Sequence, residues 1–144
     1  MKLSIFWLAL STLLPLAGAC TAHRPVQAGS SPSAIVEMHF HSFQPQVVTI
    51  RAGQTVLWKN TSLIWHTATA DPRQAKRPED VSLPEGAEAF DSGKVVAGDS
   101  FSHTFTVPGT YRYFCRPHEL KGMVGQVVVT PAPQPAQPGR AAPR

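Results

Sequence analysis

The chain has 144 residues, of which 42% are hydrophobic and 15% are charged. This composition fits one compact domain with short tails and excludes a large multidomain enzyme. The formal net charge is only +4, and the basic residues form no long run of the kind that binds nucleic acid, so no nucleic-acid partner is expected. The 2 cysteines cannot make a disulfide framework, and any role they have must be chemical or covalent.

Residues 1–19 have the pattern of a signal peptide. A basic start at Lys2 precedes an apolar stretch, and Ala17-Gly18-Ala19 supplies the small residues of a cleavage site. The stretch is short and interrupted compared with the roughly 20 apolar residues of a bilayer span, although an uncleaved anchor is the alternative. We therefore expect the mature protein to be exported.

Cys20 follows this segment directly and resembles the lipobox cysteine of bacterial lipoproteins, whose thiol takes a diacylglycerol and becomes the mature N-terminus. Ordinary signal-peptidase cleavage, after Ala19 or after Ala28, is the alternative. Residues 20–34 are expected to be a flexible leader or tether, and residues 131–144 a disordered Pro/Ala-rich tail. The predicted location is the periplasm, with a possible membrane tether through a lipidated Cys20.

Residues 35–130 are predicted to form an all-β domain. Apolar residues alternate or run in short blocks between turn signals such as Ala52-Gly53 and Pro108-Gly109. About seven short strands in one domain favour a two-sheet β-sandwich. The expected strands are 35–40, 46–50, 55–59, 66–70, 100–107, 111–114 and 124–130.

The alternation also predicts which side chains point into the sandwich. The inward candidates are Val36, Val48, Ile50, Val56, Trp58, Phe101, Phe105, Val107, Tyr111, Tyr113, Val127 and Val129. Residues 71–90 break the pattern because they are polar, of mixed charge and interrupted by Pro. We expect a long solvated connection or a short helical excursion there, with partner docking as the alternative.

The chemistry lies in residues 115–123, where Cys115, His118 and Met123 have the spacing C-x2-H-x4-M on one loop between two predicted strands. Thiolate and thioether favour copper, and Cys with two His and a weak Met bond is the ligand set of an electron-transfer copper centre. His66 is the candidate for the second imidazole. The predicted metal ligands are therefore His66, Cys115, His118 and Met123, which hold one Cu(I)/Cu(II) ion.

Simpler interpretations stand beside this one. Cys115 could be a buried structural thiol or could bond Cys20. His39 and His41 share one face of a predicted strand, where a solvent-facing position is expected and a second metal site is the alternative. His103 lies in register with inward Phe residues and is assigned no function.

A series of short motifs runs in order along two-thirds of the chain. The motifs are Phe43-x-Pro45, Val47-Val48-x-Ile50, Ala52-Gly53-x-Thr55-Val56-x-Trp58-x-Asn60, His66-Thr67, Phe90-Asp91-Ser92-Gly93, Phe105-x-x-Pro108-Gly109-x-Tyr111-x-Tyr113-x-Cys115-x-Pro117-His118 and Gly122-Met123-x-Gly125. This series resembles the cupredoxin (type 1 blue copper) family, near plastocyanin. The resemblance implies a Greek-key β-sandwich with one mononuclear copper, with His118 as the electron port and an apolar collar of Leu63, Ile64, Pro117 and Leu120.

Two positions depart from plastocyanin. Thr67 stands where an Asn commonly braces the Cys loop, so any brace must use a hydroxyl or the backbone. Phe114 replaces a Tyr used for docking, and Arg112, Arg116 and Lys121 lie close by. A photosynthetic shuttle is thereby disfavoured, and the expected partner meets a neutral-to-basic face with an apolar centre.

The resulting interpretation is a monomeric one-electron carrier between redox proteins such as cytochromes, oxidases or dehydrogenases. It is not read as an enzyme, because four protein ligands leave no open metal position for a substrate. The alternative is copper handling or delivery to an apo-enzyme, for which 3 Met residues leave few extra Cu(I) sites. A binding module that kept only the sandwich would have a broken ligand set.

Overall fold

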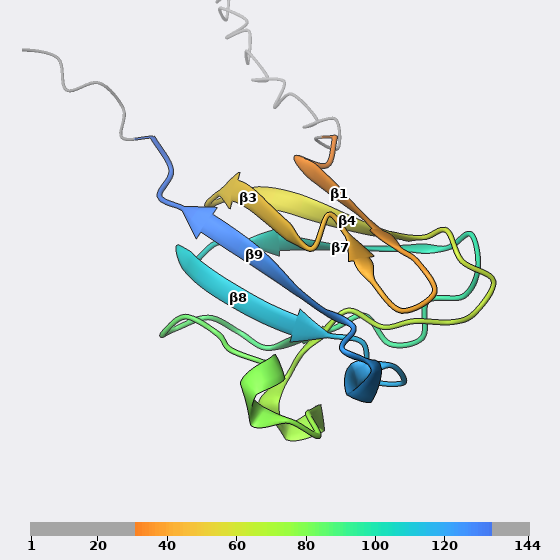
Figure 1. Cartoon of the computed structure of the whole chain (residues 1–144). Helices are drawn as coiled ribbons and strands as arrows, with labels where there is room; N and C mark the ends of the chain where they lie inside the picture. Colours follow the sequence, from red (N-terminus) through yellow and green to blue (C-terminus); the bar gives the residue numbers. More distant parts are fainter. Residues whose placement is uncertain (1–30, 134–144) are drawn as a thin grey trace, which may run out of the picture. The chain divides into compact units, whose positions relative to one another are not determined.

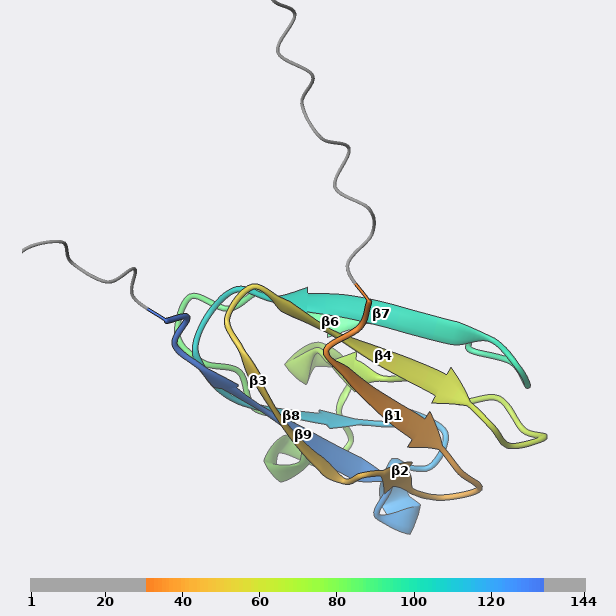
Figure 2. The same ribbon diagram turned by 90° about the horizontal axis from the view of Figure 1, so that it is seen from above.

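The computed structural model describes residues 31–133, which form two β-sheets packed face to face (Figure 1). The first sheet has the order β2-β1-β4-β7, with β1 Ala34–Met38, β2 Phe43–Gln44, β4 Gln54–Asn60 and β7 Ser100–Phe105. The second has the order β3-β9-β8-β5-β6, with β3 Val47–Arg51, β5 Thr69–Ala70, β6 Phe90–Asp91, β8 Gly109–Phe114 and β9 Val124–Thr130. Figure 2 shows β1, β4 and β7 in one layer and β8 and β9 in the other.

Both sheets mix parallel and antiparallel pairs. β1 runs parallel to β4, and β3 runs parallel to β9. β4 pairs antiparallel with β7, and β8 pairs antiparallel with β9. The predicted all-β, two-sheet Greek-key β-sandwich is confirmed. Within residues 31–133, no helix is long and apolar enough to cross a membrane.

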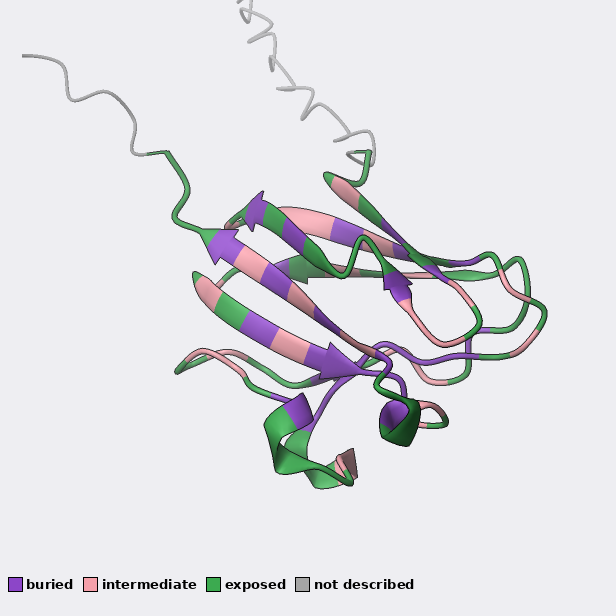
Figure 3. Ribbon diagram, in the orientation of Figure 1, coloured by how far each residue is buried: buried purple, intermediate pink, exposed green. Residues whose placement is uncertain are grey.

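The core lies between the sheets and follows the predicted alternation (Figure 3). Trp58 and Tyr113 are fully buried and meet edge to face, with ring centroids 5.3 Å apart. Of the inward candidates, Phe101 and Val107 are only partly buried. β7 is the outer strand of its sheet, which leaves Phe101 covered on fewer sides, and Val107 lies in the turn after β7.

Several predicted boundaries are wrong. The strand expected over 66–70 is reduced to an isolated bridge between His66 and Val95 and the two-residue β5. β2 and β6, also two residues long, were not predicted, because so short a segment shows no period. The strand expected over 100–107 ends at Phe105.

Residues 71–90 contain the predicted helical excursion, as two 3-10 turns, η1 Pro72–Gln74 and η2 Pro78–Asp80. Ser82 then bridges to Arg112 of β8, which attaches the segment to the second sheet. The predicted signal peptide 1–19, most of the leader 20–34 and most of the tail 131–144 lie outside the described residues, and those predictions stand as made.

The sandwich has two distinct poles. The β3–β4 turn at one pole lies beside both ends of the domain, since Ser33 donates to the Thr55 carbonyl and Ala52 donates to the Thr130 carbonyl. The loop between β8 and β9, which contains the 3-10 turn η3 Glu119–Lys121, lies at the other pole (Figure 1). The two described ends are therefore remote from the predicted metal loop.

Candidate metal centre

Three of the four predicted ligands converge at this loop pole. His66, Cys115 and His118 each place a ligand atom within 4.8 Å of the other two. The Cys115 Sγ lies 3.5 Å from the His66 Nδ1 and 3.4 Å from the His118 Nδ1. Both imidazoles thus turn the same nitrogen toward the sulfur, so one ion can meet all three atoms.

The backbone of the loop brings Met123 to the same place. The Cys115 amide donates to the Met123 carbonyl at 3.0 Å, and the Met123 amide donates to the His118 carbonyl at 3.2 Å. Gly122 has a φ of 79°, a left-handed conformation that suits glycine and ends η3 immediately before Met123. Met123 is fully buried and is positioned like the thioether of a type 1 copper site.

Burial sets the protonation of the donors. Desolvation, with the nearby charges of His118 and His41, lowers the pKa of His66 to about 4. Desolvation likewise lowers the pKa of His118 and raises that of the Cys115 thiol. The imidazoles therefore offer neutral lone pairs at neutral pH, and a metal ion must displace the thiol proton when it binds.

The orientation of His66 is fixed from outside the ligand set. Its Nε2 lies 2.8 Å from the Ser62 hydroxyl, which leaves Nδ1 as the nitrogen free for a metal. The Ser62 hydroxyl in turn contacts the side-chain oxygen of Asn60 at 2.8 Å. Buried Asn60 donates its amide to the carbonyls of Ile64 at 2.7 Å and Val95 at 3.0 Å.

Sequence reasoning missed Ser62, whose signal is its position four residues before a candidate histidine. A hydroxyl there reaches the ring nitrogen that faces away from the metal position.

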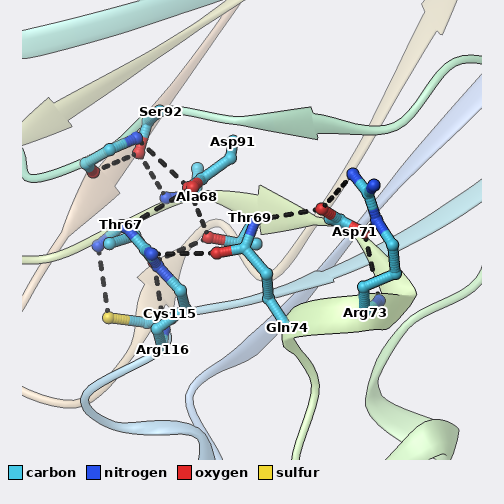
Figure 4. Close-up of polar contacts among 11 residues, drawn as sticks. Thr67, Ala68, Thr69, Asp71, Arg73, Gln74, Asp91, Ser92, Cys115 and Arg116 are labelled. Carbon is cyan, nitrogen blue, oxygen red and sulfur yellow. Dashed lines mark hydrogen bonds and ion pairs between the residues drawn. The ribbon is translucent and has the colours of Figure 1, made fainter.

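Thr67 braces the loop that carries Cys115, and it does so with both its backbone amide and its side-chain hydroxyl (Figure 4). The Thr67 amide lies 3.4 Å from the Cys115 Sγ, and the Thr67 hydroxyl accepts from the Arg116 amide at 3.0 Å. The Thr69 hydroxyl lies 2.8 Å from the Thr67 hydroxyl and 2.9 Å from the Asp91 carboxylate. Because an ionised carboxylate only accepts, the Thr69 proton faces Asp91 and Thr67 donates to Thr69.

Among the four predicted ligands, His118 is the one that is not fully buried. It lines an apolar surface hollow whose other walls include Leu63, Ile64, Trp65, Val96 and Pro117. Three of the four predicted collar residues thus line this hollow. Leu120, 59% exposed, does not, while Trp65 and Val96 were missed.

The remaining histidines have other environments. His39 pairs with Glu37 at 3.2 Å. The His41 ring packs 5.0 Å from the His118 ring, a contact the sequence did not predict. Among the described residues, the one cluster of at least three potential metal-binding side chains is His66, Cys115 and His118, so the alternative of a second metal at His39 and His41 gains no support. His103 stacks on Phe90 with a centroid distance of 4.5 Å.

Comparison with known proteins agrees with this donor set. A family model described as copper binding proteins, plastocyanin/azurin family, matches residues 33–130. The chain belongs to this family. Two imidazoles, a thiolate and a thioether fit copper by their chemistry, and copper is the metal of the family. Cupredoxins of this family are electron carriers rather than enzymes.

Individual relatives support the same assignment. The chloroplastic plastocyanin of Oryza sativa subsp. indica is 33% identical over 121 residues, covering 84% of this chain and 71% of the relative. Plastocyanin of Scenedesmus fuscus is 36% identical over 108 residues, covering 72% of this chain and 96% of the relative.

Solved structures share the fold. A mutant amicyanin in its Cu(I) form superposes with a TM-score of 0.55 and 26% identity, covering 70% of this chain and 85% of amicyanin. A purple cupredoxin from Nitrosopumilus maritimus superposes with a TM-score of 0.52 and 24% identity, covering 67% of this chain and 99% of that protein. The cupredoxin resemblance inferred from the motifs is confirmed.

Proposed function

We propose that this chain is an exported type 1 copper protein that carries single electrons between redox partners, with copper held by His66, Cys115, His118 and Met123. The observation that carries the proposal is the unequal burial of these side chains. His66, Cys115 and Met123 are fully buried, whereas His118 reaches the apolar hollow. We therefore expect electrons to pass between the copper and a partner through the His118 ring.

Bound copper supplies a Cu(I)/Cu(II) couple, and the chain supplies a site that changes little between the two states. Ser62 holds the His66 ring from one side, and the Thr67 amide faces the Cys115 sulfur from the other. The sheet strands hold both ends of the ligand loop, because Phe114 of β8 pairs with Val124 of β9. Small rearrangement on oxidation favours fast electron transfer.

Copper(II) titration tests the ligand assignment. The purified protein should develop the intense blue thiolate-to-copper absorption and a narrow-hyperfine resonance. Cys115→Ala should abolish both, and Met123→Leu should keep the colour with a shifted reduction potential, because the axial bond is weak. A Cys115→Ala protein that stays blue would refute the assignment.

Electron transport is separated from copper delivery, the competing function, by two measurements on the copper-loaded protein. Rapid electron self-exchange with retained copper supports the carrier. Slow exchange together with ready loss of copper to an apo-acceptor supports delivery and contradicts the carrier.

We also propose a periplasmic location with a lipid tether at Cys20, supported by the signal pattern of residues 1–19 and the cysteine that follows it. Mass spectrometry of the mature N-terminus tests this. A diacylated Cys20 is the expected result. A chain that begins at an unmodified Cys20 or at Gly29 contradicts the tether and leaves export intact.

A further inference from the structure

We infer that a basic groove beside the metal loop is the docking site for carboxylate side chains of an acidic protein partner. The groove is lined by Trp65, Gln74, Lys76, Lys94, Arg116 and Pro117. This inference rests on the proposed electron transfer, because it places the partner at the exposed edge of His118.

The groove is positively charged. Its lining holds three cations and no carboxylate. The nearest acidic partner of Arg116 is Asp91, with the Arg116 Nη2 3.4 Å from the Asp91 Oδ2. Asp91 also accepts from the Thr69 hydroxyl at 2.9 Å and from the Gly93 amide at 3.1 Å. One pairing therefore leaves the charges of Lys76 and Lys94 uncompensated within the groove.

The groove is continuous with the apolar hollow at His118. Trp65, Lys94 and Pro117 line both depressions. Pro117 directly precedes His118 in the chain. A partner whose apolar centre covers His118 must therefore lie over the basic groove as well, which places charges of that partner against Lys76, Lys94 and Arg116.

Two of the cationic side chains are held in place before any partner arrives. The Arg116 Nη1 donates to the Gln74 side-chain oxygen at 2.8 Å, and Gln74 donates to the Asp71 carboxylate at 3.0 Å. The Lys94 Nζ lies 5.5 Å from the centre of the Trp65 ring, a cation–π contact. Side chains ordered in advance lose less entropy on binding, which favours affinity.

The backbone at Lys76 is fixed by Glu119 of the metal loop. The buried Glu119 carboxylate accepts from the Lys76 amide at 2.8 Å and from the Arg77 amide at 2.8 Å. The Glu119 carboxylate thus binds backbone amides inside the protein, and the exposed Lys76 side chain is free to bind a partner at the surface. The groove and the metal loop are one connected unit.

An acidic protein fits these observations better than an anionic lipid surface. The cations line one concave strip beside an apolar hollow, so they match a partner with carboxylates next to an apolar patch. A headgroup layer over the same strip would cover His118 and separate it from any redox partner.

The test uses the copper(I)-loaded protein and an aspartate oligopeptide as the probe, followed by nuclear magnetic resonance of the backbone amides. At low ionic strength the peptide should shift the amides of the groove lining first. Lys76→Glu combined with Lys94→Glu should weaken binding by at least about tenfold. Arg51→Glu combined with Lys59→Glu is the matched control, because both residues are exposed and neither lines the groove; it should change affinity by no more than about twofold.

Three results would overturn the inference. The groove variant and the control could bind the peptide equally. The shifts could spread over all surface lysines. Vesicles of phosphatidylglycerol and phosphatidylcholine could retain the unmodified protein and release the groove variant, which would identify lipid as the anionic partner.

Failure of the groove is distinguishable from failure of electron transport. If the copper couple is reversible but the peptide does not bind, only the docking role of the groove is refuted. If the peptide binds but the copper couple is not reversible, only the carrier function is refuted.

Discussion

The metal loop, residues 115–123, and the connection, residues 71–90, lie side by side but are ordered in different ways. The loop is held by hydrogen bonds within itself, because the backbones of Cys115, His118 and Met123 are joined within nine residues of sequence. The connection has two short 3-10 turns and local hydrogen bonds around Asp71, and it also depends on contacts from the metal loop and from β8. The sequence therefore predicts the ligands of the loop, whereas for the connection it predicts a short helical excursion but none of the contacts that hold it in place.

Glu119 is the main contact between the two. It sits in η3, between His118 and Met123, and binds two consecutive amides of the connection. A fully buried carboxylate that accepts from backbone amides is stable only while both segments keep their positions. The loop therefore holds the connection in place as well as the metal ligands.

The largest expected loss of stability follows substitution of Gly125, which lies just after the metal loop. A Cβ there would overlap the Tyr113 ring, and Tyr113 is fully buried. Gly125→Ala should lower the free energy of unfolding by about 3 kcal/mol, measured by urea denaturation.

The matched variant on the side of the connection is Gly109→Ala, whose Cβ would lie 2.6 Å from Pro84 at a φ of 139°. We expect a smaller loss of about 1 to 2 kcal/mol, because Pro84 belongs to a surface segment that can shift. Equal losses for the two variants would mean that the connection is as rigid as the core.

The next effect concerns the contact itself. Glu119→Ala leaves the Lys76 and Arg77 amides without their acceptor and should cost about 2 kcal/mol of stability. Amide hydrogen exchange at these two residues should accelerate. Glu119→Gln keeps a carbonyl acceptor and should lose less. Glu79→Ala, on the exposed side of η2, is the control and should be close to neutral. If amide exchange at Lys76 is unchanged in Glu119→Ala, Glu119 does not hold the connection in place.

Acid should weaken the loop pole of the metal-free protein. The pKa of His66 is lowered from 6.5 to about 4, so the unfolded chain binds its proton at a higher pH than the folded chain. Stability is therefore fully present above about pH 6.5 and is lost as the pH falls toward 4, with about 2 kcal/mol lost between about pH 7 and about pH 5. His66→Gln should reduce this slope. A slope unaffected by His66→Gln would contradict the assignment.

The smallest effect is expected at the ion pair between the connection and β8. The Arg112 Nη2 lies 3.8 Å from the Asp80 Oδ1, a long contact. A double-mutant cycle of Arg112→Gln and Asp80→Asn should give a coupling of no more than about 0.5 kcal/mol. A larger coupling would show that charge, rather than the Ser82 bridge, holds the connection to the sheet.

The sequence predicts the strands and the ligand set because both depend on short patterns. Alternation over a few residues identifies β4 and β9, and the spacing of Cys115, His118 and Met123 is local. Ser62, which orients His66 from four positions away, is a local partner, but the other partners are distant in the sequence. Glu119 binds amides 42 and 43 positions earlier in the chain, and Thr67 reaches Cys115 across 48 positions. Such contacts require the sandwich to be folded first, so no window of the sequence reveals them.

Both described ends of the domain lie at the pole opposite the metal loop. Ser33 and Thr130 lie near the β3–β4 turn, and the metal loop lies at the opposite pole. A group coupled at either of these two residues is therefore attached at the pole opposite the His118 edge. A domain immobilised on an electrode through a thiol introduced at Ser33 or Thr130 should therefore face the solution with the His118 edge.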